Sequence, residues 1–486
     1  MEEEIGIETI KERSVRGIVV LTGRTFLLQI IGLAAQLLLF SYLGQYEFGV
    51  FAIVSSIINF LVYFSDIGLA AALIQKKEKP TDLDLKTTFT IQQMLISIAV
   101  VVVLLLTPFF VEKYSLTSDG KMLLYALSAS LMLSSFKSIP SVLLERKLEF
   151  IKLVFPQILE QIVYNVILVI MAMKGYGLAS FSVAVLVRGV VGLITIYYLE
   201  PWKPGFAFSR ETLKGLFKFG IPYQINTFLA TLKDDGMTII LGSIIGPVGI
   251  GILSFAQKIA RLPLTFFMDT VTRVTFPAFS RLQDHKSELE KSVTRSIFFI
   301  CFLVFPCLAG IVVLSPLLVK IVPRYDKWTL SLVPIVFISI NFAFAAATTQ
   351  LTNLLNAIGK IKITFYLMIM WTVLSWIFIP YLSFKFGVIG ASVGYSLVGA
   401  SSIVAIVVAK KFVNFSIYDS IVKPLIGTTI MTVVLLVLRK YLDISINSML
   451  ILTGVGVVAY GSSMVTMVGL SLVEDAKKSF KTIFNR

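Results

Sequence analysis

Long runs of apolar residues recur along almost the whole chain and leave few folds open to it. The runs are about 20 to 28 residues long, and a helix of that length, rising 1.5 Å per residue, crosses a hydrocarbon core of about 30 Å. With 57% hydrophobic and 15% charged residues, the chain lacks the polar surface of a soluble domain. The two-residue alternation of membrane β-barrel strands is absent from the sequence. We therefore expect an all-α polytopic membrane protein.

The apolar runs predict about fourteen transmembrane helices joined by short connections. They lie near residues 17–43, 48–74, 87–111, 121–144, 150–173, 176–199, 213–241, 248–272, 295–321, 329–356, 361–385, 387–409, 421–439 and 446–472. The predicted external loops do not exceed about a dozen residues, so no extramembrane catalytic domain is expected. Function should therefore lie within the helix bundle.

The net charge of +15 follows the predicted topology. With the N-terminus inside the cell, 28 of the 43 basic residues fall in cytoplasmic segments, nine in external loops and six inside the spans. This positive-inside bias places both termini in the cytoplasm and the chain in the cell (inner or plasma) membrane, with membrane lipids around it. No basic soluble module occurs, so nucleic acid is not expected as a partner.

Two glycine patterns indicate an internal repeat. The turn L-G-Q-Y-E-F-G at 43–49 recurs as I-G-P-V-G-I-G at 245–251, and segment 176–189 matches 386–399. Glycine is common at membrane helix ends, but both matches occupy the same place in each six-helix half. Because each half has an even number of helices, the repeat is parallel, and a substrate path is expected at its interface.

The expected organisation is two six-helix lobes in parallel repeat, followed by two C-terminal helices. Its parts are a cytoplasmic N-terminal segment 1–16, an N-lobe 17–200 (helices one to six), a C-lobe 213–410 (helices seven to twelve), helices thirteen and fourteen at 421–472, and a cytoplasmic tail 473–486. The last two helices are either an accessory pair or part of a lipid-facing groove.

Ten ionisable side chains lie at membrane depth, where a charge costs roughly 2.5–3.5 kcal/mol and normally faces water or a partner. The basic ones are Arg24, Lys137, Arg188, Lys233, Lys258 and Arg261, and the acidic ones are Asp66, Glu160, Asp234 and Asp235. This excess of basic residues favours an anionic substrate. We expect the cavity to be lined by Arg24, Arg188, Lys233, Lys258 and Arg261.

Lys258 and Arg261 are three residues apart and share one helix face. They either bind an anionic head group or pair with acids to hold the bundle together. One of Asp234 and Asp235 should neutralise a lysine, and the other is the candidate for proton coupling.

The remaining charges also have two interpretations. Arg24 either snorkels to the cytoplasmic interface or pairs with Asp66, and snorkelling is favoured for Lys137. Arg188 either lines the cavity or pairs between helices. Glu160, Gln161 and Asn165 supply hydrogen bonds either to a sugar or between helices.

Several other features bear on mechanism. Gly220 and Pro222, at the start of the second repeat, are the expected hinge, since proline removes a backbone donor. Cys301 and Cys307 share one predicted helix without disulfide or zinc spacing, so neither a metal nor a cofactor is expected. No G-x-x-x-x-G-K-[ST] motif for ATP occurs in the sequence.

The stretch F-A-Q-K-I-A-R-L-P-L-T-F-F-M-D-T-V-T-R-V-T-F-P-A-F-S-R-L-Q-D, residues 255–284, resembles the corresponding helix and loop of bacterial polysaccharide repeat-unit flippases. These Wzx-type and colanic-acid-exporter-like proteins belong to the multidrug/oligosaccharidyl-lipid/polysaccharide exporter superfamily. The turn at 43–49, S-D-I-G-L at 65–69 and R-Y-D-K-W at 324–328 are also similar to that family. Lys258 matches a cavity arginine of related flippases, and Arg24 matches a basic residue on helix one.

The resemblance implies a non-enzymatic flippase for a polyprenyl-diphosphate-linked oligosaccharide. Alternating access would carry this substrate from the inner to the outer leaflet for cell-surface polysaccharide assembly. A polysaccharide polymerase and glycosyltransferases of the same pathway are the expected protein partners. A peptidoglycan-precursor flippase and a multidrug and toxin extrusion antiporter are the alternatives. The sequence argues against the antiporter, because helix one has Arg24 and lacks the acid that is typical of that class.

Overall fold

The computed structural model describes residues 7–65, 68–76, 78–217 and 231–469. Across these ranges the regular secondary structure is entirely helical, without a strand. Twelve helices in the described residues are long and apolar enough to cross a membrane. The predicted all-α polytopic architecture is therefore confirmed.

The difference between twelve helices and about fourteen predicted spans arises at two glycines. Helix α10 (Met237–Leu282) bends at Gly246, where φ is 70°, and helix α13 (Ile361–Ala400) bends at Gly387, where φ is 59°. Only glycine adopts such angles readily. Gly246 lies between the predicted spans 213–241 and 248–272, and Gly387 begins the predicted span 387–409. In each case the structure joins two predicted spans in one helical stretch that is kinked at the glycine.

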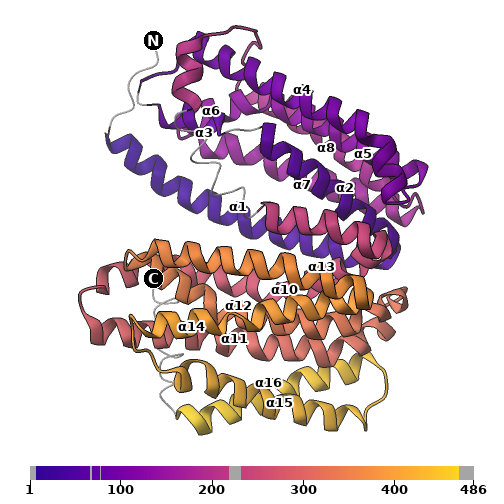
Figure 1. The fold of residues 1–486 in the computed structure, drawn as a ribbon, viewed down its shortest axis with the longest axis vertical. Coiled ribbons are helices and arrows are strands. Elements are labelled where there is room, and N and C mark those ends of the chain that lie inside the picture. Colours follow the sequence, from indigo (N-terminus) through magenta and orange to yellow (C-terminus); the bar gives the residue numbers. More distant parts are fainter. Residues whose placement is uncertain (1–6, 66–67, 77, 218–230, 470–486) are drawn as a thin grey trace. The chain divides into compact units, whose positions relative to one another are not determined.

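The chain divides into two compact units, Met1–Gly251 and Ile252–Arg486. The elements of the first unit are α1 (Ile7–Tyr42), α2 (Gln45–Ser65), α3 (Leu69–Gln75), α4 (Asp82–Lys113), α5 (Ser118–Phe136), α6 (Ser138–Arg146), α7 (Phe150–Met173), α8 (Ala179–Leu199), the helical residues 210–217, η1 (Leu232–Gly236) and the start of α10. Helix α7 packs against α1 and α8, and α5 packs against α4 and α8 (Figure 1). The predicted lobe boundaries follow the sequence repeat and stay a prediction.

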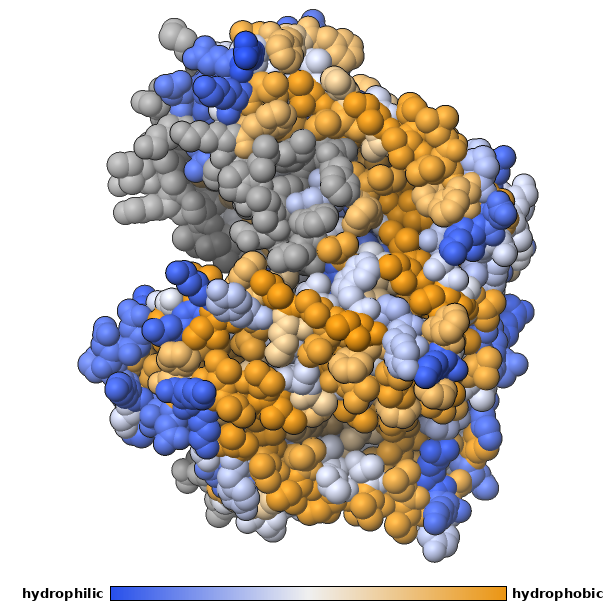
Figure 2. Space-filling view, in the orientation of Figure 1, coloured by the Kyte–Doolittle hydropathy of each residue, from blue (hydrophilic) through white to orange (hydrophobic). Residues whose placement is uncertain are grey.

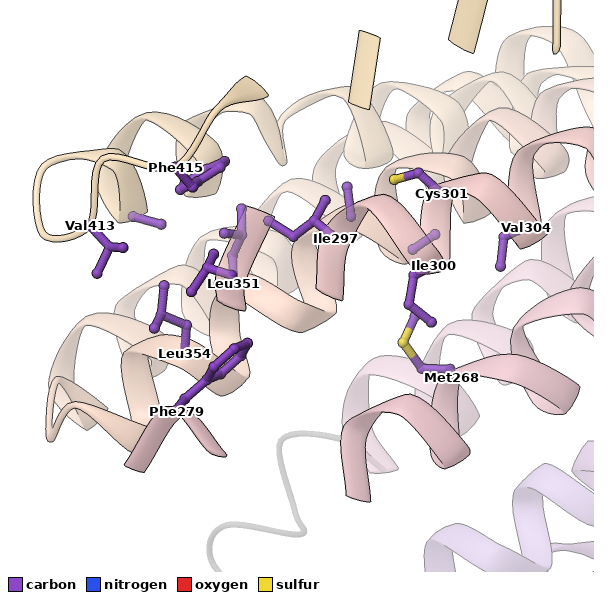
Figure 3. Close-up of a cluster of buried hydrophobic side chains, with 14 of the residues drawn as sticks. Met268, Phe279, Ile297, Ile300, Cys301, Val304, Leu351, Leu354, Val413 and Phe415 are labelled. Carbon is purple, nitrogen blue, oxygen red and sulfur yellow. The ribbon is translucent and has the colours of Figure 1, made fainter. Parts of the chain in front are cut away.

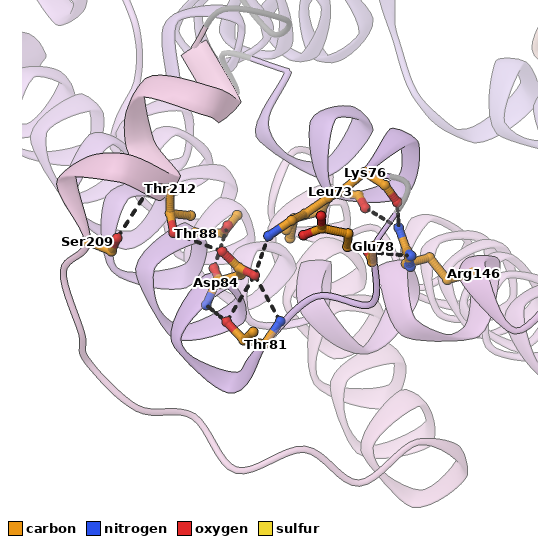
Figure 4. Close-up of polar contacts among 9 residues, drawn as sticks. All are labelled: Leu73, Lys76, Glu78, Thr81, Asp84, Thr88, Arg146, Ser209 and Thr212. Atoms are coloured by element: carbon orange, nitrogen blue, oxygen red, sulfur yellow. Dashed lines mark hydrogen bonds and ion pairs between the residues drawn. The ribbon is translucent and has the colours of Figure 1, made fainter. Parts of the chain in front are cut away.

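A buried carboxylate organises one end of the first unit (Figure 4). Thr81 caps α4 by accepting from the Asp84 backbone N–H, while the Asp84 carboxylate accepts from the Thr81 backbone N–H at 2.8 Å. The same carboxylate accepts from Lys76 Nζ at 2.6 Å and from Thr212 Oγ1 at 2.8 Å. Because Thr212 belongs to the helical residues 210–217, Asp84 joins the start of α4 to the segment that follows α8.

The second unit contains the rest of α10, α11 (Lys286–Ile321), η2 (Asp326–Ser331), α12 (Leu332–Ala357), α13, α14 (Ile403–Lys410), η3 (Tyr418–Val422), α15 (Lys423–Arg439) and α16 (Ile446–Val468). One of its hydrophobic cores joins α10, α11 and α12 through buried side chains such as Phe279, Ile297 and Leu351 (Figure 3). Val413 and Phe415, beyond α14, complete it.

Helices α15 and α16, the predicted pair outside the repeat, pack on α11. Their buried side chains Met431, Leu452 and Met464 meet Val313 of α11. The Tyr460 hydroxyl donates to the Phe302 carbonyl oxygen at 2.9 Å. These contacts make the pair an integral part of the second unit.

The surface matches a chain that spans a membrane. Apolar residues cover the middle of the helices in each unit, and hydrophilic residues gather toward the helix ends (Figure 2). Large apolar side chains such as Leu105 (74% exposed) and Ile194 (65%) would be costly in water. Lipid is the environment that accommodates them.

Candidate functional site

A polar pocket lies inside the first unit, among α2, α5, α7 and α8. Its volume is about 370 Å³. It is lined by Phe51, Ser55, Ile58, Asn59, Leu127, Ser130, Ser134, Lys137, Glu160, Tyr164, Val185, Arg188 and Gly189. Charged and hydroxyl side chains in the middle of apolar helices are expensive, so their convergence on one cavity indicates a functional role.

Glu160 of α7 is the centre of the charge cluster in this pocket. Its Oε1 accepts from Lys137 Nζ at 2.8 Å, and its Oε2 lies 3.5 Å from Arg188 Nε. The Glu160 and Lys137 side chains are only 9% and 17% exposed. Two cations and one carboxylate leave the cluster with a net charge of +1, which suits an anionic ligand.

Two local features accompany the cluster. Lys137 is the residue between α5 and α6, and its side chain reaches Glu160 of α7. On α8, Gly192 faces Glu160, and a Cβ added at Gly192 would overlap the carboxylate. A larger residue at 192 would therefore displace the Glu160 carboxylate from its present position between its two partners.

Arg188, near the middle of α8, is the exposed member of the cluster. Its side chain is 44% exposed, and its guanidinium lies over the Tyr164 ring at 5.6 Å from the ring centroid. This cation–π contact orients the guanidinium. Beyond the contact with Glu160, no hydrogen bond or ion pair joins Arg188 to the described residues.

Uncharged polar groups line the rest of the pocket. Ser130 and Ser134 come from α5, and Ser55 and Asn59 come from α2. The Ser55 hydroxyl is buried and has no hydrogen-bond partner among the described residues. Asn59 donates to Asp235 Oδ1 over a long 3.5 Å, which links the pocket to η1.

The structure corrects the expectation for Lys137. The side chain does not snorkel to the interface, because the buried carboxylate of Glu160 holds its ammonium group. Glu160 acts between helices, as one interpretation had it. Asn165 does not, since its amide donates to the Gln161 carbonyl oxygen of its own helix at 2.8 Å.

The charged triplet Lys233-Asp234-Asp235 forms a π-helical turn, η1, against α2. Lys233 Nζ lies 3.8 Å from Asp234 Oδ1, a loose pair with both side chains well exposed. Asp235 instead faces Ser56 and Asn59 of α2. The two acids therefore have different nearest partners, and their assignment to ion pairing and proton coupling stays a prediction; single π-helical turns within helices are frequent at functional sites.

Lys258 and Arg261 lie on α10 in the second unit, and both side chains are exposed. Arg24 lies on α1, half-buried, and its Nε is buried with no hydrogen-bond partner among the described residues. None of these three residues lines the polar pocket.

Three predicted site residues, Asp66, Gly220 and Pro222, lie outside the described residues. Among the residues that are described, no group of His, Cys, Asp or Glu side chains could hold a metal ion.

The sequence analysis missed most of the pocket lining. Polar residues recur four apart on three of the apolar helices: Ser55 and Asn59, Ser130 and Ser134, and Glu160 and Tyr164. Side chains four apart share a helix face. This spacing predicts a polar face on each of the three helices, but the sequence does not show that the three faces meet.

Comparison with protein families identifies the family to which the chain belongs. The family model described as "Polysaccharide biosynthesis protein" matches residues 41–332, which is more than half of the sequence. The chain belongs to this family. The resemblance to polysaccharide flippases, inferred above from 255–284 and the glycine turn, is thereby confirmed.

Relatives of this family member include the lipopolysaccharide biosynthesis protein WzxC of Escherichia coli (strain K12), which is 25% identical over 403 residues. That match covers 80% of this chain and 79% of WzxC. The teichuronic acid biosynthesis protein TuaB of Bacillus subtilis (strain 168) is 24% identical over 409 residues, covering 82% of this chain and 79% of TuaB.

Solved structures show how widely this fold is shared. The lipid II flippase MurJ in its inward closed conformation matches with a TM-score of 0.75, at 17% identity, covering 93% of this chain and 98% of MurJ. An inward-facing multidrug resistance MATE transporter of the MOP superfamily matches with a TM-score of 0.57, at 17% identity, covering 82% and 98%. The chain therefore has the fold seen in these two proteins.

Proposed function

We propose that this protein is a flippase for a polyprenyl-diphosphate-linked oligosaccharide repeat unit, used in cell-surface polysaccharide assembly. The observation that carries the proposal is a net cationic, polar pocket enclosed by membrane helices in a member of the polysaccharide biosynthesis protein family. A sugar needs hydrogen-bonding groups and a diphosphate needs positive charge, and such groups are kept at membrane depth only where a polar ligand or water meets them.

The names of the relatives support the same substrate class. WzxC and TuaB are named for lipopolysaccharide and teichuronic acid biosynthesis. The structure with a TM-score of 0.75 is titled a lipid II flippase. A peptidoglycan precursor is therefore the second candidate substrate, and the attached glycan distinguishes the two.

Lys258 and Arg261 are the proposed head-group ligands in the second unit, with Arg24, Arg188 and Lys233 as further cavity residues. An exposed cation in the middle of a membrane helix faces water rather than lipid, because burial in hydrocarbon would cost several kcal/mol. Arginine forms a bidentate fork on phosphate, and lysine acts as a mobile point charge.

The proposed movement is alternating access, with the head group inside the protein, the lipid tail in the bilayer and a hinge at Gly220 and Pro222. An inside-negative potential favours outward movement of a negative head group by roughly 2.3 kcal/mol per charge per 100 mV. This energy is available without ATP. Asp235, or its neighbour Asp234, is the proposed acid if protons are coupled.

The proposed location is the inner or plasma membrane with both termini in the cytoplasm, as the positive-inside bias indicates. The function is transport rather than catalysis. The polymerase and glycosyltransferases of the same pathway are the proposed protein partners.

A fluorescent or alkaline phosphatase fusion at residue 486 tests the proposed topology, since only a cytoplasmic C-terminus leaves the phosphatase inactive.

Deletion of the gene in its host tests the function. Polyprenyl-linked intermediates are then measured by lipid mass spectrometry. A build-up of diphosphate-linked oligosaccharide supports the proposal, and the attached mass identifies the repeat unit or a peptidoglycan precursor. An unchanged lipid profile together with new sensitivity to cationic drugs would favour drug extrusion instead.

A further inference from the structure

We propose that the polar pocket of the first unit binds a single sugar residue that carries one oxyanion, either a carboxylate or a phosphate, with Arg188 as the anion ligand. This inference rests on the proposed function, because it identifies which part of the transported glycan the pocket holds. It concerns the first unit alone and is independent of Lys258 and Arg261.

The distances within the charge cluster assign different roles to its two cations. Lys137 Nζ lies 2.8 Å from Glu160, a charge-assisted hydrogen bond, whereas Arg188 Nε lies 3.5 Å from the same carboxylate. Short contacts of this kind are the strong ones. Lys137 therefore neutralises Glu160, and the positive charge of Arg188 is left for a ligand.

The orientation of Arg188 suits an oxyanion. Its Nε lies near Glu160 and its central carbon lies over the Tyr164 ring. Guanidinium has five N–H donors in a fixed fork, so the terminal nitrogens remain for a bidentate contact with a carboxylate or phosphate. Glu160, which also lines the pocket, holds the fork in place through its contact with Nε.

Hydroxyl and amide groups around Arg188 fit a sugar ring rather than a bare anion. Ser130, Ser134 and Asn59 line the same cavity. The buried Ser55 hydroxyl has no partner among the described residues, and such a group normally finds one in a ligand or water. The cavity volume of about 370 Å³ is near the lower end of the roughly 300–1,000 Å³ typical of small-molecule sites. It fits one sugar residue better than a chain of them.

Binding of monosaccharides to the purified full-length protein tests the inference. The probes are glucuronate, glucose 1-phosphate, glucose and inorganic phosphate, each titrated at millimolar concentration by calorimetry or ligand-observed NMR. We expect glucuronate or glucose 1-phosphate to bind at least tenfold more tightly than glucose and than inorganic phosphate. A preference for glucuronate indicates an acidic sugar in the repeat unit, and a preference for glucose 1-phosphate indicates the phosphate end of the glycan.

Three variants in the pocket and one control outside it test whether binding occurs in the pocket. Arg188→Met should weaken binding of the preferred anion at least tenfold, and Arg188→Lys should weaken it less, because a point charge replaces the fork. Ser134→Leu fills the cavity without changing its charge and should also abolish binding, which keeps the test valid if Arg188→Met does not fold. Lys121→Met removes a cation over Tyr125, outside the pocket, and should leave binding unchanged.

Equal binding of glucose and the anionic sugars, or unchanged binding in both Arg188→Met and Ser134→Leu, overturns the inference. Inorganic phosphate binding as tightly as glucose 1-phosphate also overturns it, since the pocket would then be a simple anion site. These binding results do not affect the test of the flippase proposal by lipid analysis of the deletion strain. An unchanged lipid profile in that strain would refute the flippase proposal even if the sugars bind.

Discussion

Gly49 of α2 and Gly251 of α10 pack against each other's turn at backbone distance. A Cβ at Gly49 would overlap the Pro247 carbonyl oxygen, and a Cβ at Gly251 would overlap the Gln45 carbonyl oxygen. Gln45 and Pro247 differ by the same 202 positions as the two glycines. Equivalent residues thus make equivalent contacts, as two copies of one motif do when they pair about a local two-fold axis, and this supports the predicted duplication.

The first prediction follows from that contact. Gly49→Ala inserts a methyl group where the Pro247 carbonyl lies, so α2 and α10 must move apart. Overpacking of this kind costs about 1–3 kcal/mol. We expect a lower Tm in detergent and a smaller monodisperse fraction. Gly454→Ala is the control, because a Cβ there meets no atom within 4 Å. Equal Tm values for the two variants would contradict the close packing.

A second prediction concerns the pairing of Lys137 with Glu160. Lys137→Met leaves a buried carboxylate without its close partner, which for a buried pair costs on the order of 3 kcal/mol. We expect a marked fall in Tm, largely restored in the double variant Lys137→Met/Glu160→Gln. A double-mutant cycle measures this coupling. Additive losses from the two single changes would show that the pair does not act as a unit.

Third, Asp84 should stabilise the segment after α8. Asp84→Asn removes the charge that Lys76, Thr81 and Thr212 share, and a hydrogen bond to a charged group contributes about 1.5–3 kcal/mol. We expect faster backbone hydrogen exchange across 210–217. Asp82→Asn is the matched control, since its carboxylate is 68% exposed and pairs with Lys86 one turn along the same helix. Its effect should stay below about 0.5 kcal/mol.

The fourth prediction tests the proposed head-group ligands. The double variant Lys258→Gln/Arg261→Gln should insert normally and yet lose at least tenfold in polysaccharide export, with lipid-linked intermediates accumulating. Membrane insertion is checked with a C-terminal fluorescent fusion. Lys286→Gln/Lys291→Gln removes the same charge from the start of α11 and should export normally. Normal export by the first variant would refute the cationic-cavity hypothesis.

The polar pocket illustrates how far the sequence leads toward a site. Arg188 and Glu160 stand out in the sequence because a charge in an apolar run is costly wherever the helix lies. For Lys137 the sequence shows only its distance from the helix end, which favours the interface. In the structure the carboxylate of Glu160, on another helix, holds it instead.

The sequence alone determines the class of fold, the approximate number of spans and the repeat. Length and hydropathy of each run decide whether it crosses a bilayer, and these are local properties. Contacts between side chains of different helices are not local properties. Which charge neutralises Glu160, and which glycine makes room for it, depends on how α5, α7 and α8 pack. Only the tertiary structure decides these contacts, because residues that converge on one cavity are separated by whole helices in the chain.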